Sequence, residues 1–146
     1  MSCATVDVTT RPAIVFWLRA AAAYNTLVGA AIIVWPDAYF RALGLVSPMY
    51  PVLWRLVGMF ILVYAPGYWW ASRRPDAHSH IVAIGLLGKL LGPAGFLCAV
   101  VAHELPLSFG WLLLTNDVLW WPAFGTHVAR SARRAGGWSA YLGGAS

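Results

Sequence analysis

The feature that most constrains the fold is a set of four segments of about 20 predominantly apolar residues. They lie at residues 12–35, 51–71, 81–102 and 109–129. A helix of about 20 residues spans the roughly 30 Å hydrocarbon core of a bilayer, and short connections make neighbouring helices antiparallel. The sequence therefore predicts an all-α, polytopic membrane protein with a four-helix transmembrane bundle at residues 12–129 and tails at residues 1–11 and 130–146.

The composition excludes an ordinary soluble domain. Of the 146 residues, 60% are hydrophobic and 10% are charged, whereas a soluble globular domain has about 25% charged residues. Nine tryptophans and six tyrosines suit the two membrane interfaces. A net charge of +5 would otherwise suggest nucleic acid, but the arginines flank the apolar segments. We therefore expect the lipid bilayer as the partner, through its anionic headgroups, and no nucleic acid.

Positive charge sets the expected orientation, because it accumulates in cytoplasmic loops. Six arginines flank the segments on one side and two lie on the other: Arg11, Arg73, Arg74, Arg130, Arg133 and Arg134 against Arg41 and Arg55. An even number of crossings also requires both termini on one side. The sequence therefore predicts that both termini are cytoplasmic.

Polar residues inside the apolar segments are the candidate functional residues, namely Asn25, Lys89, Asn116 and Asp117. A charge at the bilayer centre costs about 2.5–3.5 kcal/mol, so it calls for a partner, a route to water or a function. At 1.5 Å per residue, Lys89 lies about 12 Å and Asp117 about 18 Å from the cytoplasmic surface. These depths predict an intramembrane ion pair, with Asn25 at a similar level. The set either fixes helix register or serves as a proton path or ligand site.

Glycines and a proline surround the lysine in the stretch GLLGKLLGPAG at residues 85–95. Gly85, Gly88 and Gly92 share a helix face with Lys89, so a neighbouring backbone can approach closely. Pro93 has no amide hydrogen to donate to the Lys89 carbonyl, so that oxygen loses its helical partner. In the second segment, Pro66 likewise leaves the carbonyl four residues before it without a helical donor. We expect helix breaks at Pro66 and Pro93, which either frame a small cavity or merely shape the bundle.

Other polar residues lie at the ends of the segments. On the outer face we expect an ion pair between Arg55 and Glu104. The histidines lie near the interfaces, so we expect no metal site, and the residues identify no cofactor. Cys3 lies in the tail and Cys98 in an apolar segment, where we expect it to be buried and unreactive.

A family resemblance rests on three stretches: YPVLWRLVGMFILVYAPGYWWASRRP, HIVAIGLLGKLLGPAGF and ELPLSFGWLLLTNDVLWWPAF. They resemble a group of small bacterial four-helix membrane proteins of unknown function, some of which carry the label alkyl hydroperoxide reductase, and more distantly the DoxX-like proteins. The resemblance covers about residues 12–125. It implies a four-helix fold in a bacterial inner membrane and, as candidate residues, Lys89, Asn116, Asp117 and Glu104.

The function expected from these observations is non-enzymatic. Peroxide reductases of that label need a reactive thiolate and a resolving thiol, which Cys3 and Cys98 do not readily supply. We expect an accessory or assembly subunit of a membrane complex, or a binder of a lipid-like, hydrophobic small molecule. The alternative is a small proton-coupled transporter that uses Lys89 and Asp117 and works as a homo-oligomer. A weaker alternative is a component of a membrane oxidoreductase.

Overall fold

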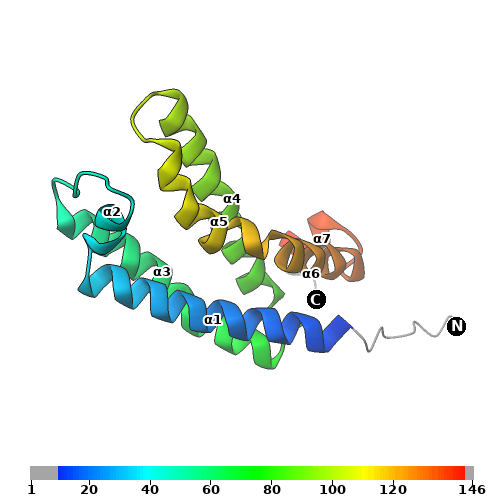
Figure 1. Cartoon of the computed structure of the whole chain (residues 1–146). Helices are drawn as coiled ribbons and strands as arrows, with labels where there is room; N and C mark the ends of the chain where they lie inside the picture. The colour runs from blue at the N-terminus through cyan, green and yellow to red at the C-terminus, as the bar shows by residue number, and fades with distance from the viewer. Residues whose placement is uncertain (1–9, 144–146) are drawn as a thin grey trace, which may run out of the picture.

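The computed structural model describes residues 10–143, and the predictions made for Cys3 and for the outermost parts of both tails lie outside them. Every regular element in these residues is helical, as predicted (Figure 1). The long helices are α1 (Thr10–Val34), α3 (Pro51–Arg73) and α4 (Ser79–Val101). The shorter elements are α2 (Ala38–Ala42), η1 (Leu107–Gly110), α5 (Trp111–Asn116), η2 (Val118–Trp120), α6 (Trp121–Arg134) and α7 (Trp138–Leu142).

Among the residues that the structure describes, three helices are long and apolar enough to cross a membrane: Pro12–Val34 within α1, Pro51–Arg73 and Ser79–Val101. Each has 23 residues, which at 1.5 Å per residue is about 35 Å. They correspond to the first three predicted segments, with ends that differ by one or two residues. The prediction of a helical protein with membrane-crossing helices is confirmed to this extent.

The fourth predicted segment is not one helix, which corrects the prediction of a continuous span at residues 109–129. α5 ends at Asn116, and Asp117 has φ −121° and ψ −62°, outside the helical region. Asn and Asp side chains compete with the helix for backbone hydrogen bonds. Pro122, at the start of α6, also cannot donate to the Val118 carbonyl. These residues divide the segment into α5, η2 and α6.

The helix breaks predicted at Pro66 and Pro93 do not occur. α3 and α4 each run without interruption through their proline. A proline removes one backbone hydrogen bond from a helix, and the neighbouring i to i−4 bonds remain. In α4 another group replaces the lost donor, as described below.

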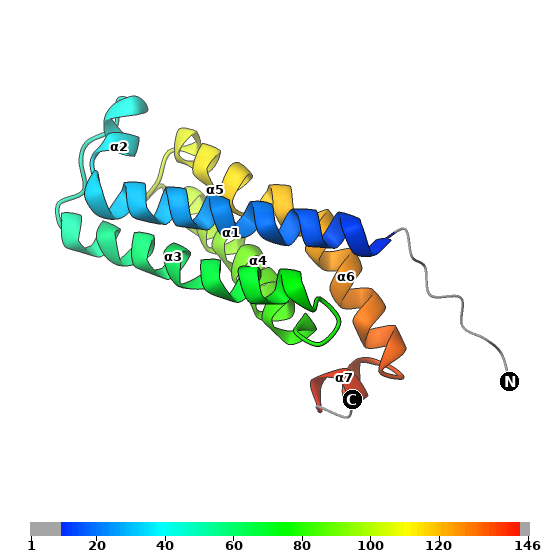
Figure 2. The ribbon, with the colours of Figure 1, turned by 90° about the horizontal axis from the view of Figure 1, so that it is seen from below.

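α1 and α3 pack side by side along most of their length (Figure 2). Two glycines allow this approach. A Cβ atom on Gly29 would lie 2.8 Å from the Gly58 carbonyl oxygen, and one on Gly58 would lie 2.9 Å from the Gly29 carbonyl oxygen. The two backbones therefore meet at a point where neither has room for a side chain.

α4 and α5 form a hairpin that rises away from the α1–α3 pair (Figure 1). The buried core lies at the other end, where α1 begins, α3 ends and α6 packs on α4. Its largest fully buried side chains are Leu18, Tyr68, Val82 and Phe124. Because the core is concentrated at this end, the space between α3 and the hairpin is less completely filled.

Polar contacts at the core end tie α6 and α7 to the α3–α4 connection. Arg134 Nη1 lies 2.8 Å from Asp76 Oδ1, and His127 Nε2 lies 3.1 Å from the Pro75 carbonyl oxygen. The His80 ring stacks on that of Tyr141, with centroids 4.5 Å apart. The end of α6 is therefore on the same side of the molecule as the connection between α3 and α4.

An aromatic cluster closes the opposite end, where Tyr39 of α2 links to the start of the fourth segment. Its hydroxyl donates to the Phe109 carbonyl at 2.7 Å and accepts from the Leu112 amide at 2.9 Å. Burial raises the pKa of the Tyr39 hydroxyl above its ordinary value. The Trp54 ring packs edge-on against Phe109.

Candidate functional site

A cleft of about 470 Å³ lies between α3 on one side and α4, α5 and the connection between them on the other. This volume is within the range of small-molecule sites, roughly 300–1,000 Å³. Most of its lining is apolar and aromatic, including Phe60, Tyr64 and Phe96. The charged residues in the lining are Lys89 and Asp117, and the two asparagines of the sequence, Asn25 and Asn116, line it as well.

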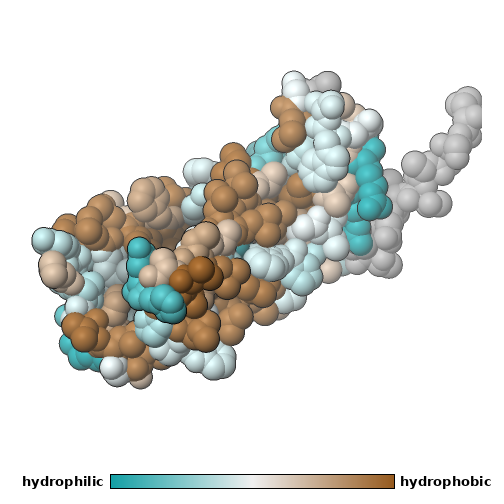
Figure 3. Space-filling model, turned by 90° about the horizontal axis from the view of Figure 1, so that it is seen from above, coloured by the Kyte–Doolittle hydropathy of each residue, from teal (hydrophilic) through white to brown (hydrophobic). Residues whose placement is uncertain are grey.

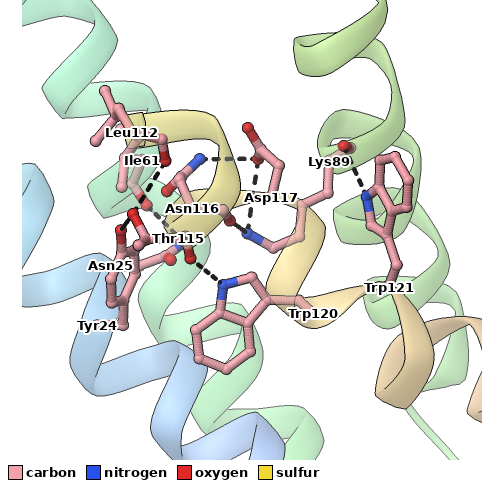
Figure 4. A network of polar contacts seen from close by, with 10 residues as sticks. All are labelled: Tyr24, Asn25, Ile61, Lys89, Leu112, Thr115, Asn116, Asp117, Trp120 and Trp121. Carbon is pink, nitrogen blue, oxygen red and sulfur yellow. Dashed lines mark hydrogen bonds and ion pairs between the residues drawn. The ribbon is translucent and has the colours of Figure 1, made fainter. Parts of the chain in front are cut away.

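Lys89 extends from α4 toward the break in the fourth segment (Figure 4). Its side chain is 5% exposed, and Nζ lies 4.0 Å from Asp117 Oδ1. The ammonium also donates a short hydrogen bond to the Asn116 carbonyl. The rings of Tyr68 and Trp120 lie 5.9 and 5.7 Å from Nζ, within the range of cation–π attraction. The charge is thus compensated by a carboxylate, a carbonyl dipole and two aromatic faces.

The break supplies the carbonyl that Lys89 uses. A continuous helix would bond the Thr115 and Asn116 carbonyls to amides one turn later. The Trp120 indole instead donates to the Thr115 carbonyl at 2.9 Å, and Lys89 binds that of Asn116. Both exposed carbonyls are therefore satisfied by side chains, as buried backbone polar groups require.

The carbonyl that Pro93 leaves without a helical donor also has a partner. The Trp121 indole Nε1 lies 3.0 Å from the Lys89 carbonyl oxygen and donates to it (Figure 4). The Lys89 carbonyl, which the sequence predicts to lack a helical donor, therefore accepts a hydrogen bond from a side chain instead. The same bond attaches α6 to the middle of α4.

Asp117 packs against the glycine face of α4. A Cβ atom on Gly92 would lie 3.1 Å from Asp117 Oδ2, so a larger residue would push the carboxylate away. The Asn116 side-chain amide donates to Asp117 Oδ1 at 2.8 Å. Gly85 makes similar room, because a Cβ atom there would overlap the Tyr68 hydroxyl. The sequence predicts that a neighbouring backbone approaches these two glycines, whereas the atoms that do so belong to the Tyr68 and Asp117 side chains.

Asn25 reaches the cleft from α1. It is 2% exposed, and its amide nitrogen donates to the Ile61 carbonyl at 3.1 Å. Its oxygen Oδ1 and that of Asn116 are buried without a hydrogen-bond partner. Each amide nitrogen bonds to an acceptor, which fixes the orientation of both amides and leaves the two oxygens free.

The structure thus brings Lys89, Asp117, Asn116 and Asn25 together on one cleft. It does not bring Arg55 and Glu104 together: no ion pair between them is found among the side chains that the structure describes, and both residues are exposed. At this end of the molecule, α3 instead meets the hairpin through the Trp54 and Phe109 rings, whose centroids lie 5.7 Å apart. Glu104 is not part of the cleft lining.

Two further expectations are corrected. Cys98 is exposed on α4, not buried. The cavity exists, but Gly88, Gly92 and Gly95 line it instead of the two prolines, and Pro66 faces a separate hollow beside Arg19 and Trp69. Glycines on one helix face let a neighbouring side chain come close, and they leave empty space where no neighbouring side chain fills it.

Sequence reasoning missed Trp120 and Trp121 as partners of the polar set. The sequence shows that both tryptophans lie shortly after the Asn-Asp pair. It does not predict the helix break that turns both indoles toward carbonyls without a helical donor. No group of three or more His, Cys, Asp or Glu residues that could hold a metal occurs within residues 10–143.

Comparisons with known proteins add no relative. No protein-family model, no curated protein and no solved structure matches this chain. The functional assignment therefore depends on the cleft and its polar end.

Proposed function

We propose that this protein is a small, non-enzymatic membrane protein that binds a lipid-like molecule in the cleft between α3 and the α4–α5 hairpin. The observation that carries the proposal is an apolar cleft of about 470 Å³ with a buried polar cluster in its wall. Ligand sites commonly combine a mostly apolar lining with a few polar groups that fix orientation. An ionisable residue at membrane depth is also a default candidate for function.

The mouth of the cleft favours a ligand that arrives from the bilayer. Phe60 on α3 is exposed, and so are Gly88, Gly92 and Gly95 on α4. Because these glycines have no side chains, the opening between the two helices stays wide. Apolar residues cover much of the face shown in Figure 3, with small, separate polar patches. A molecule dissolved in lipid could reach the cleft without crossing water.

The setting we propose is a bacterial inner membrane, with both termini in the cytoplasm and the α5–η2–α6 segment as a fourth, interrupted crossing. The resemblance to small bacterial four-helix proteins and the distribution of arginines support this setting. Discontinuous helices occur inside membranes where side chains satisfy the freed backbone groups. The outward-facing apolar surface also suits other membrane-protein subunits, so an accessory or assembly role is compatible with ligand binding.

A proton-coupled transporter is the second candidate, and the interrupted segment is the observation that favours it. Transporters often place substrate and ion sites at broken helices near the bilayer midplane. Here the break coincides with Asp117 and exposes the carbonyl that binds Lys89. A homo-oligomer would then supply the pathway. Uptake into proteoliposomes that persists after joint replacement of Lys89 and Asp117 would exclude this role.

A membrane oxidoreductase component, the weaker alternative, would place its organic substrate in the same cleft. A visible absorption band in the purified protein, or reduction of an added organic acceptor, would favour it. Neither the resemblance nor the polar set requires such chemistry.

The test of ligand binding fills the cleft without disturbing its walls. A Cβ atom on Gly95, which lines the cleft, would meet nothing within 4 Å, and the same holds for Gly125 of α6, which does not line it. Gly95→Leu should therefore fold and block the cleft, and Gly125→Leu is the matched control. We expect mass spectrometry of gently solubilised protein to find an amphiphile bound to the wild type and to Gly125→Leu but lost from Gly95→Leu. Equal occupancy in all three proteins would contradict the proposal.

A further inference from the structure

Around the inner part of the cleft, the amide and carboxylate oxygens without a partner are acceptors, and the hydroxyls of Tyr64 and Tyr68, which also line the cleft, can donate or accept. Asn25 Oδ1 and Asn116 Oδ1 are buried without partners. Asp117 Oδ1 accepts from the Asn116 amide and faces the Lys89 ammonium, and within the described residues no donor bonds to Oδ2. A buried acceptor without a partner is destabilising, so a group that donates hydrogen bonds here would be favoured.

The nitrogen donors of Lys89, Asn25 and Asn116 are already engaged. Lys89 Nζ binds the Asn116 carbonyl and faces Asp117, and the two asparagine nitrogens bind Ile61 and Asp117. The indole N–H of Trp54 is unpartnered, but it lies near the start of α3, about 15 Å along the helix from Tyr64. It cannot serve the same head group.

The charges of the cluster cancel. Lys89 and Asp117 are the charged residues of the lining, and they form one ion pair. An anionic head group would bring its charge beside Asp117 with no free cation to compensate it. A cationic head group would add an unbalanced charge beside Lys89 in a low-dielectric site, which is costly.

We infer, on the basis of the ligand-binding function proposed above, that the cleft selects an uncharged amphiphile whose polar end donates hydrogen bonds, such as a long-chain or polycyclic alcohol. Its hydroxyl group bonds to Asn116 Oδ1, Asn25 Oδ1 or Asp117 Oδ2. Its apolar body lies along the glycine face of α4 and the Phe96 and Leu112 side chains, which line the cleft toward the aromatic cluster. The asparagines determine specificity, and the glycines provide the space.

The test compares three probes of equal chain length in nanodiscs that contain the full chain. They are a long-chain primary alcohol, its methyl ether and the corresponding carboxylate, each with the same photoreactive group in its tail. The ether keeps the shape and the acceptor but lacks the donor. We expect the alcohol to bind at least about fivefold more tightly than the ether, as a donor to a buried acceptor implies. The carboxylate should bind more weakly than the alcohol.

Substitution of the asparagines assigns the preference to the cleft. Asn116→Leu and Asn25→Leu should each reduce the ratio of alcohol to ether affinity toward one. Thr126→Val removes a hydroxyl from α6 outside the cleft and should leave the ratio unchanged. If either asparagine variant fails to fold, the probe comparison on the wild type still decides.

The outcomes separate this inference from the proposed function. Equal binding of alcohol and ether, abolished by Gly95→Leu, would keep the cleft as a ligand site and overturn the donor preference, because water or protein would then satisfy the oxygens. Tighter binding of the carboxylate would overturn it as well. Absence of binding by any probe, together with no co-purified amphiphile, would overturn the proposed function itself.

Discussion

The indole N–H of Trp121 donates to the backbone carbonyl of Lys89 across 3.0 Å, at the position where Pro93 removes the helical donor. The side chain of the same lysine binds the Asn116 carbonyl, which the break in the fourth segment exposes. The carbonyl freed in α4 is therefore paired by a side chain from the fourth segment, and a carbonyl freed in the fourth segment is paired by a side chain from α4. Neither α4 nor the fourth segment has all its polar groups paired alone, so we expect the two to fold as a unit.

Replacement of Trp121 tests this arrangement. Trp121→Phe keeps the ring but removes the donor, which leaves the Lys89 carbonyl unpaired and should lower the free energy of unfolding by about 1 kcal/mol. In a Pro93→Ala background the alanine amide can bond to that carbonyl, so Trp121→Phe should cost much less. Thermal unfolding of the four proteins in one detergent measures the difference. An equal cost in both backgrounds would mean that the indole does not replace the missing helical donor.

The ion pair at the cleft predicts a second non-additive result. Asp117→Ala leaves the buried Lys89 charge with a carbonyl and two aromatic rings, and loss of one member of a buried pair costs about 3–5 kcal/mol in soluble proteins. Lys89→Met together with Asp117→Ala removes both charges, so the double variant should be more stable than Asp117→Ala alone. Chemical denaturation in mixed micelles compares them.

The second ion pair provides the control. Arg134 and Asp76 have side chains that are 54% and 39% exposed, and exposed pairs contribute about 0–1 kcal/mol. Arg134→Gln should therefore change stability by less than about 1 kcal/mol. If Asp117→Ala lowers the free energy of unfolding no more than Arg134→Gln does, the Lys89 charge does not depend on Asp117 for compensation, against the geometry.

The sequence was sufficient to predict the features that depend on periodicity and depth. Apolar length located three long helices, and counting 1.5 Å per residue from the segment ends brought Lys89 and Asp117 to neighbouring levels. The spacing of the glycines on either side of Lys89 indicated a face that a neighbour could approach. These features follow from regular helix geometry, which holds along α4 and approximately along the part of the fourth segment that precedes its break at Asp117.

The break at Asp117 could not be predicted in the same way, because it depends on tertiary partners. Asn116, Asp117 and Pro122 weaken a helix locally, but Pro66 and Pro93 do so too, and their helices continue. The fourth segment opens where Lys89 and Trp120 can bond to the exposed carbonyls. The divergence of the α4–α5 hairpin from α3 likewise depends on where the buried core lies.

Two glycines of similar helical context should respond differently to a methyl group. A Cβ atom on Gly58 would lie 2.9 Å from both the Gly29 carbonyl oxygen and Ile32 Cγ2, whereas one on Gly95 would meet nothing within 4 Å. Gly58→Ala should force α1 and α3 apart and cost about 1–3 kcal/mol. Gly95→Ala should be neutral or stabilising by up to about 1 kcal/mol, because alanine favours the helix. Thermal unfolding of both variants would contradict this if Gly58→Ala were as stable as Gly95→Ala.

The contacts of α6 predict the membrane topology. The Arg134–Asp76 ion pair and the His127 contact to the Pro75 carbonyl hold the end of α6 beside the α3–α4 connection. If α3 and α4 span the bilayer, the interrupted fourth segment must return the chain to that side. Single-cysteine variants in a background without Cys3 and Cys98 test this with a membrane-impermeant thiol reagent. We expect Ala77→Cys and Ser139→Cys to be labelled from the cytoplasmic side and Ser108→Cys from the opposite side. Labelling of Ser139→Cys from the same side as Ser108→Cys would require three crossings and would separate Arg134 from Asp76, against the geometry of the molecule.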